Sequence, residues 1–254
     1  MNEILWTADI HLNFFEKDEI EQLAAKLDAP VVISGDIAEG HNFPELLALL
    51  ASAAGVPVYF VLGNHDLYGI TRDEARAQAA NVPGATYLSN RDEPVALTDT
   101  VALVGTDGWY DCRNGSYDAS NLELADFRRI KDLEYCDRHL RLTVFQRWAD
   151  DDSLALVNRV EDALDAGYAE VYAVTHVPPV PMSSRHEEYS GLPFYSNFLL
   201  GGMLKVLASR YPEQFVTVLA GHTHRGGRKQ LAHNLAVYVS ESDYEVPVLQ
   251  RIPL

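Results

Sequence analysis

The chain has 254 residues, of which 47% are hydrophobic and 22% charged, an ordinary composition for a globular protein that is long enough to bury a large core. Its net charge of −17 gives no general attraction to a nucleic-acid backbone or an anionic membrane, and no apolar run is long enough to span a bilayer. The first residues, Met1 to Trp6, lack the basic start and apolar core of a signal peptide, so we expect a cytoplasmic protein.

Apolar strands alternate with helices in the first third of the chain. Three apolar runs predict buried strands, at residues 3–9, 31–34 and 58–62. Helices are predicted over residues 18–27 and 44–54, and a third begins after Thr71. Gly55 suits the end of the second helix, and Thr71 with Glu74 has the spacing of a capping box. This alternation predicts parallel strands joined by right-handed crossovers.

The rest of the chain has shorter strands and one irregular segment. Residues 107–139 are polar and aromatic, and predict a loop-rich insertion over the site formed by the motifs below. Cys112 and Cys136 lie in this insertion without a C-x-x-C spacing, so we expect reduced thiols. The other non-strand segments are a helix ending near residue 167, an ordered loop at residues 177–193 and a helix at residues 198–211. Further strands are predicted at residues 95–97, 101–104, 171–174, 215–219, 235–240 and 246–252. No repeat or linker appears, so residues 1–254 are expected to form one domain.

Five short motifs follow apolar runs of the sequence. They are Asp9-x-His11, Gly35-Asp36, Gly63-Asn64-His65-Asp66, Thr175-His176 and Gly221-His222-Thr223-His224. Open α/β sheets bind ligands at the carboxyl ends of their strands, so we expect these motifs to meet at one edge. Residues two apart in an extended segment point to the same side, so each D-x-H or H-x-H pair can face one site. Carboxylate, imidazole and amide donors suit divalent metals such as manganese, iron or zinc, whereas a closed thiolate zinc site is disfavoured.

Taken in this order, the five motifs resemble those of the calcineurin-like metallophosphoesterase superfamily, and they extend over nearly the whole chain. The resemblance implies an α/β fold, a four-layer α/β/β/α sandwich of two facing mixed sheets. It also implies a site for two divalent metal ions. One metal would be bound by Asp9, His11 and His224, the other by Asn64, His176 and His222, with Asp36 bridging the two. The family often has Gly where this chain has Thr175, although the Val177-Pro178-Pro179 segment that follows His176 still resembles the family's loop.

The activity implied by the resemblance is hydrolysis of a small phosphate monoester or diester by a hydroxide that the two metals share. By the same analogy, His65 protonates the leaving group and Asp66 orients the imidazole of His65. An isolated histidine at a strand end is more often structural, but its place between Asn64 and Asp66 in this motif favours catalysis.

Substrate contacts are less sharply indicated by the sequence. Arg225 directly follows a predicted ligand, and Trp109 lies in the predicted insertion; packing or surface charge would explain either residue equally well. A nuclease or a phosphoprotein phosphatase of the same superfamily is an alternative function, although the acidic balance argues against a nuclease. A non-catalytic metal-binding interaction module is another, but here every ligand position and His65 are filled. Neither the substrate nor the oligomeric state is indicated.

Overall fold

Two β-sheets face each other in the computed structural model, which describes residues 2–182, 189–243 and 246–254. The strand order of the first sheet is β11 (Gln250–Pro253), β1 (Glu3–Thr7), β2 (Val31–Ser34), β3 (Val58–Val61) and β4 (Ala85–Tyr87). Strands β1 to β4 are parallel, and β11 pairs with β1 in the antiparallel direction. The carboxyl ends of the first three strands therefore lie at the same edge.

The second sheet is also mixed, with parallel strands at its centre. Its strand order is β5 (Val95–Ala96), β6 (Val101–Gly105), β7 (Glu170–Val174), β8 (Phe215–Ala220), β10 (Leu235–Val239) and β9 (Gly227–Ala232). Strands β6, β7, β8 and β10 are parallel, while β5 and β9 are antiparallel edge strands. The sequence analysis did not predict β4 or β9, because β4 is short and β9 is mostly polar and exposed.

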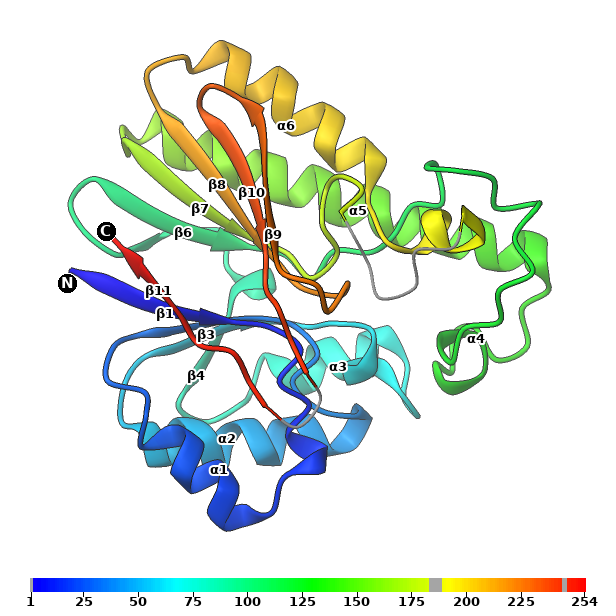
Figure 1. Ribbon diagram of the computed structural model, residues 1–254, viewed down its shortest axis with the longest axis horizontal. Coiled ribbons are helices and arrows are strands. Elements are labelled where there is room, and N and C mark those ends of the chain that lie inside the picture. The colour runs from blue at the N-terminus through cyan, green and yellow to red at the C-terminus, as the bar shows by residue number, and fades with distance from the viewer. Residues whose placement is uncertain (1, 183–188, 244–245) are drawn as a thin grey trace.

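Helices cover the outer face of each sheet (Figure 1). The α-helices are α1 (Lys17–Ala24), α2 (Phe43–Ala54), α3 (Arg72–Ala79), α4 (Asp126–Arg129), α5 (Arg138–Asp165) and α6 (Phe198–Arg210). Short 3-10 helices occur at Leu12–Phe14, Gly40–Asn42, His65–Leu67, Leu88–Asn90 and Tyr189–Phe194. In Figure 1, α1 and α2 lie below the first sheet and α5 and α6 lie above the second, so the four-layer α/β/β/α prediction is confirmed. None of the helices in the described part of the chain is both long and apolar enough to cross a membrane.

Successive residues of the central strands belong to different hydrophobic clusters. On β2, Val32 packs between the two sheets, whereas Ile33 packs toward the helices of its own sheet. On β7, Val174 lies between the sheets and Ala173 faces the helices of the second sheet. Because both faces of these strands are buried, their sequences are continuous apolar runs. This explains why the polar motifs that end the runs are conspicuous in the sequence.

The predicted helix boundaries are mostly confirmed. Helix α2 ends at Ala54, and Gly55 adopts a left-handed conformation with φ 65°. Helix α3 has both hydrogen bonds of the capping box between Thr71 and Glu74. Helix α1 is shorter than predicted, since it ends at Ala24, three residues before the buried Leu27.

The predicted insertion, residues 107–139, contains the short helix α4 and the first two residues of α5, and its backbone is otherwise irregular. The insertion packs mainly through aromatic side chains. Tyr110 and Phe127 both contact Phe145 of α5, with ring centroids 4.9 Å and 5.9 Å from that of Phe145, respectively. The buried carboxylate of Asp111 accepts hydrogen bonds from the backbone N–H groups of Arg113 and Leu199. The insertion is therefore tied to both α5 and the start of α6.

Candidate metal centre

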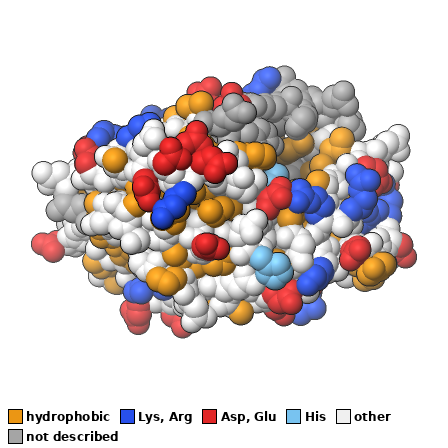
Figure 2. Space-filling view, turned by 90° about the horizontal axis from the view of Figure 1, so that it is seen from below, with side chains coloured by type: hydrophobic (Ala, Val, Ile, Leu, Met, Phe, Trp, Pro, Cys, Tyr) orange, Lys and Arg blue, Asp and Glu red, His pale blue; other side chains and the backbone are white. Residues whose placement is uncertain are grey.

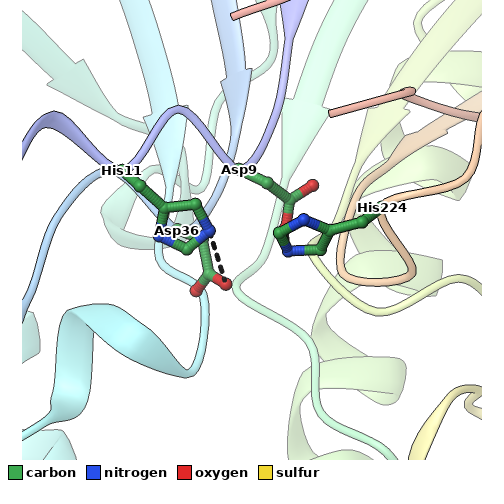
Figure 3. A group of neighbouring side chains, drawn as sticks. All are labelled: Asp9, His11, Asp36 and His224. Carbon is green, nitrogen blue, oxygen red and sulfur yellow. Dashed lines mark ion pairs between the residues drawn. The ribbon is translucent and has the colours of Figure 1, made fainter. Parts of the chain in front are cut away.

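The loops after β1, β2, β3, β7 and β8 bring all seven predicted metal ligands together. Asp9, His11, Asp36 and His224 form one group, whose ligand atoms all lie within 4.8 Å of one another. Their side chains point toward a common centre from three separate loops (Figure 3). His11 Nε2 lies 4.0 Å from Asp36 Oδ2, and His224 Nε2 lies 3.5 Å from Asp9 Oδ1.

Asn64, His176 and His222 form a second group beside the first. Asn64 Oδ1 is 3.1 Å from both His176 Nε2 and His222 Nδ1, and these two nitrogens are 3.3 Å apart. Asp36 joins the two groups, because its Oδ1 lies 3.5 Å from His176 Nε2 while its Oδ2 faces His11. The residues therefore lie in two neighbouring groups, and which of them bind each metal stays a prediction.

Backbone carbonyl groups orient two of the imidazoles. His176 Nδ1 lies 2.8 Å from the carbonyl oxygen of Ser34, and His222 Nε2 lies 2.8 Å from that of Phe194. A carbonyl oxygen only accepts, so these ring nitrogens are the protonated ones. The opposite nitrogens, Nε2 of His176 and Nδ1 of His222, then present lone pairs to the centre, as metal-binding histidines do.

The backbone of the site is held in an unfavourable conformation. Five of the seven predicted ligands have positive φ angles, a region that non-glycine residues rarely adopt. They are Asp9 (53°), His11 (43°), Asp36 (53°), His222 (72°) and His224 (56°). Such strain persists only where the surrounding fold enforces it, and it is concentrated at functional sites.

Two motif glycines allow the loops to approach one another. A Cβ atom on Gly63 would lie 2.2 Å from Asp36 Oδ1, and one on Gly221 would lie 2.6 Å from Asp9 Oδ2. Both distances are far below van der Waals contact, so a side chain at either position would displace a ligand.

The electrostatics of the donor set fit divalent cations. Burial lowers the pKa of His11 and of His222 to about 4 and that of His224 to about 3, so these imidazoles are neutral at pH 7. Burial acts to raise the pKa of Asp36, but the neighbouring His176 and His65 outweigh it and hold the pKa below its usual range. Burial and the charge of Asp36 raise the pKa of Asp9. Neutral imidazoles beside two crowded carboxylates are the state from which metals bind.

His65 lies at the edge of the centre, and Asp66 lies behind it. The side chain of His65 is 21% exposed, its Nε2 is 3.9 Å from Asp36 Oδ2, and its ring packs 4.5 Å from that of Tyr68. The Asp66 carboxylate accepts hydrogen bonds from the backbone N–H groups of Ile37, Ala38 and Gly63. These hydrogen bonds join the loops after β2 and β3, and orientation of the His65 imidazole by Asp66 stays a prediction.

A cavity of about 410 Å³ opens beside the metal ligands. Its apolar wall is formed by Leu124 and Ala125 from the insertion and by Phe194 and Tyr195. At its rim, Arg129 donates hydrogen bonds to both carboxylate oxygens of Glu39 and stacks on the Tyr68 ring.

The two predicted substrate contacts are not among the residues that line this cavity. Trp109 is 3% exposed and packs against Trp148 and Tyr110 with ring centroids 5.0 Å apart, so its placement gives it a packing role. Arg225 is exposed and follows His224, outside the residues that line the cavity.

Sequence analysis missed two residues at the site, Tyr68 and Asp126. The Asp126 carboxylate accepts hydrogen bonds from Asn64 Nδ2 at 2.9 Å and from the Tyr68 hydroxyl at 2.8 Å. Burial and the Asp126 charge raise the pKa of Tyr68, which stays a neutral donor. The one sequence signal was the position of Tyr68, two residues after the G-N-H-D motif; Asp126 belongs to no motif.

Comparison with known proteins identifies the family and the fold of the chain. The family model for calcineurin-like phosphoesterases matches residues 3–226. Among solved structures, the phosphopantetheinyl hydrolase of Mycobacterium tuberculosis has a TM-score of 0.67 at 16% identity, over 96% of this chain and 90% of that one. A dimetal phosphatase from Danio rerio has a TM-score of 0.58 at 17% identity, over 96% and 88%. At these identities the two structures establish a shared fold. No curated protein shows significant similarity to the chain. Because the family model spans most of its length, the chain belongs to the calcineurin-like phosphoesterase family.

Proposed function

We propose that the protein is a dinuclear metal-dependent phosphoesterase that hydrolyses a small phosphate monoester or diester. The observation that carries the proposal is the pair of ligand groups that share Asp36, with one carboxylate oxygen facing each group. Membership of a phosphoesterase family supports hydrolysis as the reaction class.

The metal ions and the residues around them would have different roles in the reaction. Two divalent ions, with manganese, iron and zinc the best fits, would supply charge stabilisation for the phosphoryl oxygens and lower the pKa of a water molecule toward neutrality. The Asp36 carboxylate lies between the two ligand groups, with one oxygen facing each of them. His65, partly exposed and beside Asp36, would donate a proton to the oxygen of the leaving group.

The surroundings of the site favour a small substrate. A cavity of about 410 Å³ has room for a phosphoryl group and a modest alcohol, which the apolar wall of Leu124 and Phe194 would contact. The net charge of −17 argues against a long polyanion. Among the described side chains on the face drawn in Figure 2, acidic and basic groups are interspersed and the basic ones form no continuous track. These features support a small ester over a nucleic-acid strand.

The test is hydrolysis by metal-stripped protein that has been reloaded with manganese, with bis-p-nitrophenyl phosphate and p-nitrophenyl phosphate as paired substrates. Turnover that returns with the metal is the expected result, and the ratio of the two rates distinguishes a diesterase from a monoesterase. Two bound metals per chain without turnover of either ester would count against this function and in favour of a binding role. Failure to bind two metals would contradict the dinuclear centre itself.

A further inference from the structure

Asp126, at the start of α4 in the insertion, is a buried carboxylate held by three side chains. Asn64 Nδ2 and the Tyr68 hydroxyl donate to its Oδ1 at 2.9 and 2.8 Å, and the Tyr110 hydroxyl donates to its Oδ2 at 2.9 Å. Asp126 is 2% exposed. Since a buried carboxylate is costly unless its oxygens are hydrogen-bonded, these donors hold it in place.

The bond from Asn64 has a consequence for the metal centre. A side-chain amide has an accepting end and a donating end, and either could face His176 and His222. A carboxylate only accepts, so Asp126 selects the NH₂ end of Asn64 and leaves Oδ1 facing the two imidazoles. With the amide reversed, two acceptor oxygens would meet at Asp126 and N–H groups would face the place of a cation.

The insertion is itself fixed to the loop that carries Asn64. The backbone N–H of Gly69 donates to the carbonyl of Arg129, and that of Lys131 donates to the carbonyl of Ile70. Helix α4 is therefore joined to the segment directly after the G-N-H-D motif by backbone bonds as well as by Asp126.

We propose that Asp126 is a positioning residue for the metal that Asn64 binds, and that the insertion completes the centre through it. The inference rests on the proposed dinuclear function. Partners that orient a metal ligand from behind typically contribute about 10–100-fold to metal affinity. The effect should be confined to one of the two metals, because the described contacts of Asp126 lead to Asn64 and not to the group of Asp9, His11 and His224.

The test is a manganese titration of metal-stripped wild type and Asp126→Asn by isothermal calorimetry. We expect the variant to bind one metal as wild type does and the other about 10–100-fold more weakly. The matched control is Asp111→Asn, which alters another fully buried carboxylate of the same insertion whose described partners are Arg113 and the backbone of Leu199. This control should keep both affinities.

A double-mutant cycle identifies the affected metal. In an Asn64→Ala background, Asp126→Asn should cause no further loss, since the two changes act on the same contact. Additive losses, equal weakening of both metals, or unchanged affinities in Asp126→Asn would each overturn the proposal. If Asp126→Asn does not fold, Tyr110→Phe removes one of the bonds that hold the carboxylate; a smaller loss at the same metal supports the proposal, and no loss opposes it.

Binding is measured without substrate, so the outcome separates this inference from the phosphoesterase function. Wild-type protein that binds two metals but hydrolyses no ester would refute the function and leave the role of Asp126 to be decided by the titrations. Wild-type protein that binds fewer than two metals would refute both.

Discussion

The carboxylate of Asp36 lies between the two ligand groups, with its oxygens 4.0 Å from His11 Nε2 and 3.5 Å from His176 Nε2. Its pKa is held below the usual range despite burial, because His176 and His65 surround it. A neutral residue at this position would retain the shape of the side chain and lose the charge that both metals share. Substitution of Asp36 is therefore a direct test of whether this carboxylate bridges the two metals.

For Asp36→Asn we expect metal and activity to be lost together, with the affinity for both metals falling by at least about 10–100-fold, the range seen when even indirect partners of a metal are removed. Metal content per chain and turnover would be measured on the same sample. Asp73→Asn, an exposed carboxylate on α3, serves as the control and should change neither. A variant that keeps two metals would show that Asp36 does not bridge them.

Unlike Asp36→Asn, the variant His65→Asn should lose activity without losing metal. It is expected to keep both metals, because His65 lies beside the ligands without joining either group, and to lose about 10²–10⁴-fold in turnover of an alkyl phosphate ester. The loss should be smaller for a p-nitrophenyl ester, whose leaving group needs little protonation. Rates for the two esters at fixed metal content test this, and full activity toward the alkyl ester would exclude the acid role.

At the scale of elements, helix α6 contains two adjacent glycines in different surroundings. A Cβ atom on Gly201 would lie 2.1 Å from the carbonyl oxygen of Pro179, in the loop after His176, whereas a Cβ atom on Gly202 would meet nothing within 4 Å. Gly201 thus permits the close approach of α6 to the loop that follows a metal ligand, and Gly202 has no comparable contact. Substitution of each glycine by alanine therefore tests the effect of close packing separately from the effect of helix propensity.

Gly202→Ala should raise the free energy of unfolding by about 0.5–1 kcal/mol, because alanine loses less backbone entropy in a helix. Gly201→Ala should lower it by about 1–3 kcal/mol, because the helix and the loop must move apart. Urea unfolding of both variants provides the comparison, each serving as control for the other. Equal effects of the two substitutions would mean that α6 does not pack closely on Pro179.

At the scale of the whole molecule, the predicted metal centre joins loops from both sheets. Asp9, Asp36 and Asn64 follow strands of the first sheet, while His176 and His222 follow strands of the second. Bound metals would link the two halves of the sandwich and neutralise crowded carboxylates in a chain whose net charge is −17. Metal binding should therefore stabilise the fold as well as the site.

Addition of manganese at about 100 times its Kd should stabilise the metal-stripped protein by about 2.7 kcal/mol for each site filled. The check is the shift in Tm between chelator-treated and reloaded protein. The Asp36→Asn variant should show a much smaller shift under the same conditions. Two bound metals with an unchanged Tm would mean that the unfolded chain binds them equally well.

Much of this fold could be predicted from the sequence, because the signals for strands and helix ends lie within a few neighbouring residues. Buried strands such as β2 and β7 appear as continuous apolar runs, Gly55 ends α2, and Thr71 caps α3. The predicted ligands follow such runs directly, so parallel pairing alone predicts that those of each sheet lie at one edge of it, whereas the meeting of the two edges depends on how the sheets pack. Polar, exposed β9 had no such run, and only its pairing with β10 identifies it as a strand.

The sequence by itself indicated the α/β fold, most of the strands and helices in their order, and a candidate set of metal ligands with the class of chemistry they suit, because each of these signals lies within a few neighbouring residues. The tertiary structure alone decided how the irregular insertion packs. It placed Trp109 in an aromatic cluster, turned the Asp66 carboxylate toward backbone N–H groups, and brought Asp126 to Asn64, 62 residues away in the chain. Such contacts leave no periodic pattern, since they depend on the shapes of side chains that meet only after folding.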